Sequence, residues 1–478
     1  MTPMNPRLSQ FGIIGFSAVL MVATGLFAFQ SINQLSQSNL LDADSIQTPE
    51  GSYSYETRIQ KGDAYFEGGF YTEAASEYAY ASQLQTQLSE PLLKLSAAYT
   101  ALNDFTKAEE NAKKAYDLEA GSEAPSAETV AIYAHTLLNN SKAEEAINLL
   151  NAYSEPNQSL LYTKGLATIA TGTPLDAKTY FEQALAQSGT VTPSSIQGFL
   201  TAYESYEKAQ GSDASYLNAL LSKALLDANE CVLAENLALS TLKVKSDYRD
   251  VWMVLGYSQL QLNELAKAED SFKAAKKIDS IKPEVHYLLG TTHFLQNEYQ
   301  EAIDEMELSL LYDFEPAAEA YKKMAESHTA LGQYQEALAA YEAMVNVDPS
   351  SISLFKEPIR LALEQVQDFD RAETLAQKGI TLFPSEALSH SLLAEVYLKK
   401  GETDLANDSI QVAFDINPSD AEAHFIAGEI REQQGNVEGA EWEYKKAFEL
   451  SEAGDDINLS AAESYNRLMT QAVTPAVE

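Results

Sequence analysis

Six histidines are the side chains of this 478-residue sequence best suited to metal binding or proton transfer near neutral pH. A zinc site would also need carboxylates or thiols that converge on the same point. His286 and His293 stand seven residues apart, which is two helical turns and too far to hold one ion together. We therefore interpret the histidines as packing residues between helices and expect no metal site.

The motifs of common catalytic sites are absent from the sequence. There is no G-x-S-x-G, no H-E-x-x-H and no G-x-x-x-x-G-K-[ST]. Glu109-Glu110 is most simply a solvated helix face, and Asp455-Asp456 lacks the twelve-residue pattern of a calcium loop. The single cysteine, Cys231, cannot form an internal disulfide or a thiolate cluster, and we expect it in the turn of a hairpin. We predict no catalytic residue and no cofactor.

The elements that carry these residues repeat every 34 to 35 residues from Arg249 onward. Five small residues and one arginine occupy the eighth position of the six repeats: Gly256, Gly290, Ala325, Arg360, Ala394 and Gly428. An alanine follows twelve residues later in all six: Ala268, Ala302, Ala337, Ala372, Ala406 and Ala440. A period of this length is typical of stacked helical hairpins. We infer that the small residues stand where the two helices of a hairpin cross closely.

The first repeat of this series resembles a tetratricopeptide repeat. The family pattern is W-x2-L-G-x2-Y, then A-x3-F, then P; Trp252, Leu255, Gly256, Ala268 and Phe272 match it. The resemblance is strong from Arg249 onward and looser over residues 55–248. It implies a solenoid that offers a long surface to a partner and has no reaction centre of its own.

We predict an all-α chain, a tetratricopeptide-like α-solenoid of about eleven antiparallel helical hairpins. A capping helix with a polar outer face, Ile457–Val473, is expected to close it. Pro358 inside a first helix predicts a distortion there. Residues 192–214 fit no repeat and predict one extra helix, Ser194–Ala209, where the superhelix bends. The expected segments are a short cytoplasmic N-terminus at 1–10, a transmembrane span at 11–29, a polar linker at 30–54, the loose array at 55–248, the regular array at 249–454, and the capping helix and tail at 455–478.

Residues 11–29 form an uncharged apolar run. As a helix this run would span about 28 Å, enough to cross a bilayer. Arg7 precedes it and no basic residue follows until Arg58, which predicts a cytoplasmic N-terminus and extracytoplasmic repeats. The alternative is a cleaved signal that leaves the repeats as a secreted or periplasmic protein.

The tetratricopeptide resemblance also implies a ligand groove, lined by positions 2, 5, 6, 9, 12 and 13 on the first helix of each repeat. Carried over to this sequence, these positions supply our candidate groove residues: Met253, Val254, Tyr257, Leu260, Tyr287, Leu288, Phe294, Leu295, Lys322 and Lys323. A contiguous exposed apolar patch usually marks a binding site, and tyrosine is a typical anchor. We expect a short peptide with hydrophobic anchors and one acidic group. The alternative is that further packing covers these side chains.

The formal net charge of −38 bounds the choice of partner. A surface this negative repels nucleic acid and favours basic or neutral proteins. We therefore expect a membrane-tethered, non-catalytic scaffold for protein–protein interactions. Two alternatives stay open: an accessory subunit of an envelope- or glycan-assembly enzyme complex, and a structural surface protein that assembles with itself.

Overall fold

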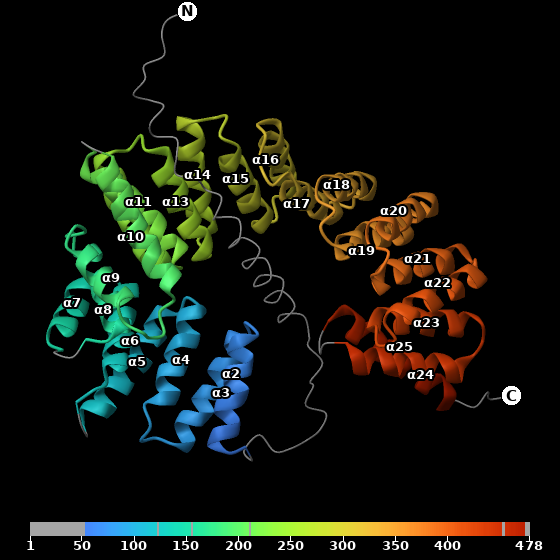
Figure 1. Cartoon of the computed structure of the whole chain (residues 1–478), viewed down its shortest axis with the longest axis horizontal. Helices are drawn as coiled ribbons and strands as arrows, with labels where there is room; N and C mark the ends of the chain where they lie inside the picture. Colours follow the sequence, from blue (N-terminus) through green and yellow to red (C-terminus); the bar gives the residue numbers. More distant parts are fainter. Residues whose placement is uncertain (1–52, 122–123, 154–155, 210–211, 452–454, 474–478) are drawn as a thin grey trace, which may run out of the picture. The chain divides into compact units, whose positions relative to one another are not determined.

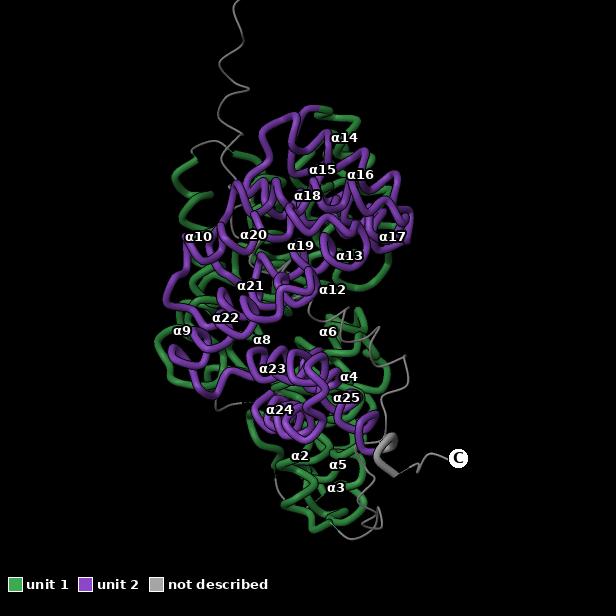
Figure 2. Tube along the Cα trace, turned by 90° about the vertical axis from the view of Figure 1, so that its right-hand side faces the viewer, with its two compact units in different colours: residues 1–280 green, residues 281–478 purple. Residues whose placement is uncertain are grey.

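The computed structural model describes residues 53–121, 124–153, 156–209, 212–451 and 455–473. These residues form 24 α-helices and no strand, which confirms the predicted all-α fold. The chain divides into two compact units, Met1–Ser280 and Ile281–Glu478 (Figure 1, Figure 2). The division therefore falls one hairpin beyond Arg249, where the regular repeats begin.

Unit 1 consists of six helical hairpins and one unpaired helix in its described part. The hairpins are α2 (Tyr55–Glu67) with α3 (Tyr71–Leu84), α4 (Glu90–Ala101) with α5 (Phe105–Ala120), α6 (Ala127–Asn139) with α7 (Ala143–Asn151), α8 (Gln158–Ala170) with α9 (Ala177–Leu185), α11 (Ala214–Asp227) with α12 (Cys231–Val244), and α13 (Arg249–Gln261) with α14 (Leu265–Ile278). The unpaired helix is α10 (Pro193–Lys208), close to the extra helix that the sequence predicts.

Unit 2 consists of five hairpins and a final helix in its described part. The hairpins are α15 (Pro283–Leu295) with α16 (Tyr299–Leu311), α17 (Ala317–Ala330) with α18 (Tyr334–Val347), α19 (Lys356–Leu361) with α20 (Phe369–Leu382), α21 (Ala387–Lys400) with α22 (Thr403–Ile416), and α23 (Ala421–Gln433) with α24 (Val437–Leu450). The final helix is α25 (Asp456–Val473), which packs on α24. The described residues thus contain the eleven hairpins and the capping helix that the sequence predicts.

Small residues stand where the two helices of a hairpin cross, as the repeat pattern predicts. A Cβ atom added to Gly256 would lie 2.6 Å from the ring of Phe272, and one added to Gly428 would lie 2.6 Å from the ring of Tyr444. The aromatic ring of the second helix therefore fills the space that the glycine leaves. The alanines of the second helices, such as Ala268, are completely buried.

Every hairpin turn contains one residue in the left-handed backbone region. Five are glycines, and the other six are Asn103, Ser141, Asn229, Asn263, Asn297 and Gln367. Glycine and asparagine adopt this conformation at the lowest steric cost. The turn chemistry of the loose repeats in unit 1 is therefore the same as that of the regular ones.

First helices of neighbouring hairpins contact each other, as in α6 with α8 and in α21 with α23. Second helices of neighbouring hairpins make no comparable contact in the described part of the chain. Each stack therefore curves with its first helices on the inner side. In unit 1 the curvature is tight after α10, because α12 reaches back to contact α6 and α8.

The hairpin of α19 is distorted, as Pro358 predicts. Its first helix is broken into a 3₁₀ segment at Ile352–Phe355, the short α19, and a π-helical segment at Ala362–Val366. The close crossing here involves Gly379 on α20, because a Cβ added to it would lie 2.8 Å from Cδ1 of Ile352. Arg360 occupies the position that is small in the other repeats, but the close approach in this hairpin is instead made by Gly379 and Ile352.

Three expectations about particular segments differ from the structure or lie outside it. The predicted transmembrane span 11–29 lies outside the described residues. Within the part of the chain that the structure describes, no helix has both the length and the apolar character to cross a bilayer. The outer face of α25 is not wholly polar, because Leu459 and Met469 are 46% and 40% exposed. Cys231 is the first residue of α12 and is buried, since the turn ends one residue earlier.

Candidate binding surfaces

The candidate groove residues of unit 1 all lie on α13, and they are buried. Met253, Val254, Tyr257 and Leu260 are each at most 3% exposed. α13 packs against α11, α12 and α14. The expectation that these four side chains form an exposed apolar patch is therefore wrong, because the neighbouring elements of a solenoid cover more of α13 than its sequence periodicity indicates.

The candidate groove residues on α15 of unit 2 differ in exposure. Tyr287 and Leu288 are each 3% exposed, and the ring of Tyr287 stacks on that of Phe314 with centroids 4.3 Å apart. Their expected exposure is wrong for the same reason as on α13. Phe294 and Leu295, near the C-terminal end of α15, are only partly buried. These two remain available to a partner.

The two candidate lysines on α17 have different surroundings. Lys322 is exposed, whereas Lys323 is 5% exposed. The Nζ atom of Lys323 lies 2.6 Å from a carboxylate oxygen of Glu326 and 4.0 Å from the centre of the Phe294 ring. Burial lowers the pKa of Lys323, and the Glu326 carboxylate opposes this effect. An acidic group of a partner would therefore find Lys322, because Lys323 is already paired.

Two histidines join the two helices of a hairpin through a carboxylate. Nδ1 of His286 lies 2.7 Å from Glu305, and Nδ1 of His424 lies 2.6 Å from Glu443. Both histidines are buried, and both carboxylates stand nineteen residues further along the chain. Arg58 and Glu77 occupy the same two places in the first hairpin. The histidines therefore act as packing residues that also carry a polar link.

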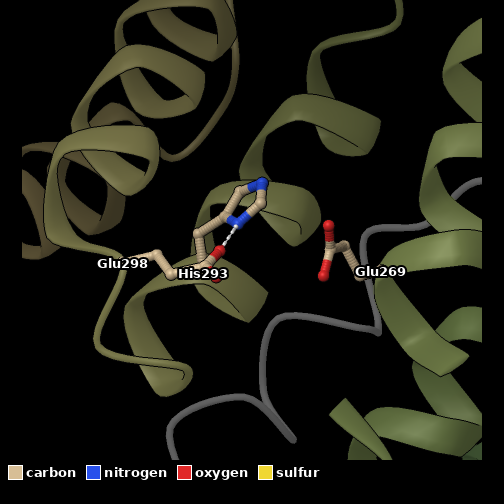
Figure 3. A group of neighbouring side chains, drawn as sticks. All are labelled: Glu269, His293 and Glu298. Atoms are coloured by element: carbon tan, nitrogen blue, oxygen red, sulfur yellow. Dashed lines mark hydrogen bonds and ion pairs between the residues drawn. The ribbon is translucent and has the colours of Figure 1, made fainter. Parts of the chain in front are cut away.

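His293 makes a similar link across the turn that follows α15. Its Nδ1 atom lies 2.6 Å from Oε2 of Glu298 (Figure 3). Glu269, which is also drawn in Figure 3, belongs to unit 1 and pairs there with Lys273. The histidine is 7% exposed, so this pair fixes the end of the first helix relative to the turn.

A charged cluster on the first helices of unit 2 is not evident from the sequence. Arg360 of α19 pairs with Glu395 of α21 and with Glu422 of α23, and Lys356 lies 2.6 Å from Glu422. Burial is the main cause that raises the pKa of Glu395 to about 7; Arg360 opposes this rise, and Glu422 and Glu429 contribute to it. The signal in the sequence is Arg360 itself, a charge at a position that is otherwise small.

A second polar cluster lies inside unit 1. Glu230, which precedes α12, accepts one hydrogen bond from the hydroxyl of Tyr162 of α8 at 3.3 Å and pairs with Nε2 of His135 of α6 at 2.8 Å. Burial lowers the pKa of His135, but the carboxylate outweighs it, so the pKa lies above its ordinary value. His135 and Glu230 line a cavity of about 540 Å³. The repeat spacing does not predict that these residues meet, because the contact of α12 with α6 and α8 joins hairpins that are not neighbours in the repeat.

Family models of the tetratricopeptide repeat match two stretches of the chain, residues 219–281 and 318–351. These two stretches are tetratricopeptide repeats. The matched stretches cover α12 to α14 in full, and α17 with α18, so they include both the end of the loose array and part of the regular one. No curated protein sequence is significantly similar to the chain.

Several solved structures are similar to this chain at low sequence identity. Yeast Tom70 is 15% identical, with 87% of this chain and 96% of that chain covered and a TM-score of 0.30. A tetratricopeptide repeat protein from Parabacteroides merdae is 17% identical, with 57% and 99% covered and a TM-score of 0.35. YrrB, described as having an unusual peptide-binding site, is 15% identical, with 48% and 97% covered and a TM-score of 0.30. At these TM-scores the likeness carries no weight for function.

Proposed function

We propose that the chain is a non-catalytic scaffold that binds peptide segments of other proteins. The observation that carries this proposal is the series of eleven hairpins in the described residues, which only the unpaired helix α10 interrupts and of which two stretches match models of the tetratricopeptide repeat. A stack of hairpins presents a long surface in which each repeat contributes a few side chains. Such a surface suits recognition of an extended segment.

The accessible candidates on unit 2 support a contact with mixed character. Phe294 and Leu295 offer apolar surface, and Lys322 offers a positive charge. Phe294 is held in place by the Nζ atom of Lys323 above its ring and by an edge-on contact with Tyr299. A preorganised aromatic side chain loses little entropy on binding, which makes it a good anchor. A peptide with an apolar side chain and a nearby carboxylate fits these groups.

The apolar run 11–29 supports the further proposal that the scaffold is tethered to a membrane. The single positive charge before the run favours repeats on the extracytoplasmic side. In that arrangement the polar residues 30–54 separate the repeats from the bilayer. Protease protection in intact cells tests the topology: the proposal requires the repeats to be cleaved by external protease, and protected repeats contradict it.

Crosslinking of the full chain in its native membrane, followed by identification of the captured proteins, tests the scaffold proposal. We expect a small set of other proteins, recovered reproducibly and lost when the crosslinker is omitted. Capture of copies of this chain alone, together with a size that grows with concentration in light scattering, would instead show a self-assembling structural protein. Capture of nothing above background also contradicts the proposal.

A further inference from the structure

The cavity beside His135 and Glu230 is built from parts of unit 1 that are far apart in the sequence. Its walls come from the first three hairpins, from the turn between α11 and α12 with the start of α12, and from the end of α13. Nδ2 of Asn103 donates a hydrogen bond of 3.2 Å to the backbone carbonyl of Gln261, which links the turn between α4 and α5 to the end of α13. Its volume of about 540 Å³ lies within the range of ordinary ligand sites.

One lining side chain has no partner in the described part of the protein, although it is almost completely enclosed. Asn139, the last residue of α6, is 9% exposed. Its amide makes no hydrogen bond with the described residues, and both amide atoms keep accessible surface. Asn139 stands four residues after His135, so the two side chains line the cavity from the same face of α6. An enclosed amide without a partner is unfavourable, and a ligand in the cavity can remove that cost.

The lining offers negative charge without a free positive charge. Glu230 is its one carboxylate, and none of the lining residues is a lysine or an arginine. His135 is its one histidine, and the ring pairs with that same carboxylate at 2.8 Å. The pair therefore carries no net positive charge in either protonation state of the imidazole. An anion would find no counter-charge here, whereas a cation is attracted both by the carboxylate and by the net charge of −38 on the chain.

Several hydrogen-bond donors of the lining are already used within the protein, which leaves acceptors open. The hydroxyl of Thr100 donates to a backbone carbonyl at 3.0 Å, and Nδ2 of Asn103 donates to the end of α13. The side-chain oxygen atoms of both residues remain as acceptors. Nε2 of His135 donates to Glu230, whose carboxylate oxygens can each accept a further hydrogen bond. A ligand group with several N–H donors therefore fits this lining.

Three aromatic side chains complete the lining: Phe66, Tyr71 and Phe105. The rings of Phe66 and Tyr71 pack edge to face, with centroids 5.2 Å apart. The backbone carbonyl of Phe105 accepts a hydrogen bond of 2.7 Å from Nδ2 of Asn140, which fixes the third residue. Aromatic faces attract cations, and a guanidinium group also stacks flat on them. Because arginine combines such a cation with five N–H donors, it matches the rings, the carboxylate and the open acceptors together.

We propose that this cavity binds an arginine side chain from a segment of a partner protein, whose guanidinium donates to the carboxylate of Glu230 and to the amide oxygen of Asn139. The inference rests on the proposed scaffold function and adds a basic residue to the chemistry of the segments that the scaffold takes. The cavity lies within unit 1 and is distinct from the accessible candidates on unit 2.

A matched pair of probes tests the charge of the ligand. N-acetyl-argininamide and N-acetyl-citrullinamide have nearly the same shape, but citrulline carries an uncharged urea in place of the guanidinium. Saturation-transfer NMR measures the affinity of each probe for the full chain. We expect saturable binding of the arginine probe and about tenfold weaker binding of the citrulline probe, because a charge-assisted hydrogen bond is lost. Equal affinity of the two probes, or no saturable binding of either, overturns the proposal.

Substitutions in the cavity test the site. Glu230→Gln removes the charge and keeps the shape, so it should weaken binding of the arginine probe about tenfold. Glu110→Gln, at an exposed position of α5 outside the cavity, removes the same charge and should bind as the wild type does. Asn139→Leu removes an amide that has no partner in the described residues, so it should weaken binding about fivefold without lowering the Tm. This second variant keeps the test valid if circular dichroism shows that Glu230→Gln does not fold. Unchanged binding by a folded cavity variant overturns the site.

Crosslinking in intact cells distinguishes an arginine of a partner protein from a free small cation. We expect Glu230→Gln to lose at least one protein that the wild type captures, and Glu110→Gln to retain all of them. Loss of probe binding with every partner retained assigns the cavity to a free cation and overturns the proposed source. If the wild type captures partners but does not bind the arginine probe, this inference fails and the scaffold function stands. Probe binding without any captured partner contradicts the scaffold function and, with it, the proposed source of the arginine.

Discussion

Glu395 shows how the stack of helices in unit 2 buries a carboxyl group. The carboxyl group is 5% exposed and lies beside Arg360 and Glu422, which come from the first helices on either side. Desolvation disfavours the ionised form more than one guanidinium at 3.5 Å favours it. The folded chain therefore holds this proton at a pH where an unfolded chain has released it.

This proton predicts a pH dependence of stability. The pKa of Glu395 rises from its ordinary value of 4.5 to about 7 on folding. The unfolded chain therefore releases this proton first, and the free energy of unfolding falls as pH rises between these values. Glu395→Gln, which mimics the neutral form, should gain up to about 3 kcal/mol relative to the wild type between pH 4.5 and pH 8. Urea unfolding at the two pH values measures the gain.

Glu438→Gln, at an exposed position of α24, is the control and should show no such gain. If the free energies of unfolding of Glu395→Gln and of the wild type change equally with pH, the prediction is refuted.

The glycines at the helix crossings predict a second effect at the residue scale. Gly256→Ala forces a Cβ against the buried ring of Phe272 and should destabilise unit 1 by about 1–3 kcal/mol. Gly198→Ala, within α10, meets no atom within 4 Å and should instead stabilise it by about 1 kcal/mol. Thermal unfolding monitored by circular dichroism compares the two. A Gly256→Ala variant as stable as the wild type would show that the crossing tolerates more separation than the structure has.

At the scale of the elements, each hairpin turn depends on one residue in the left-handed backbone region. Gln367 is the bulkiest residue that occupies the left-handed region at a hairpin turn, with φ of 57°, whereas Gly401 occupies the next such turn with φ of 80°. We expect Gly401→Gln to destabilise unit 2 by about 1–2 kcal/mol, because a side chain there is strained. Gln367→Gly should be neutral or stabilising. Urea midpoints measure both, and a stable Gly401→Gln variant would contradict the steric argument.

The elements were predictable from the sequence to the extent that they obey the repeat. The spacing of Gly256, Ala268 and Phe272 specifies which residues meet inside a hairpin, and Pro358 marks where the first helix breaks. The groove could not be predicted in the same way. Exposure of Met253 or Tyr257 depends on how the adjacent elements pack over α13, and the 34-residue period carries no information about that packing. The cavity beside His135 and Glu230 depends likewise on the contact of α12 with α6, which the repeat spacing does not encode.

At the scale of the whole molecule, the net charge of −38 predicts the class of partner. The chain should show no saturable binding to a 30-base-pair DNA duplex at physiological salt, since both carry high negative charge. Association with a basic partner should weaken as salt rises, because screening removes the long-range attraction. Fluorescence anisotropy measures both. Tight, salt-insensitive binding of DNA would contradict the proposed choice of partner.

Recovery of partners by crosslinking in intact cells, compared between matched variants, tests the scaffold function most directly. Phe294→Ser with Lys322→Glu changes the accessible candidates on the first helices of unit 2. Leu311→Ser, at a position of α16 that is 69% exposed, removes an apolar side chain from a second helix and serves as control. The account predicts that the double variant loses at least one partner while the control retains all of them. Identical partners in all three proteins would contradict it.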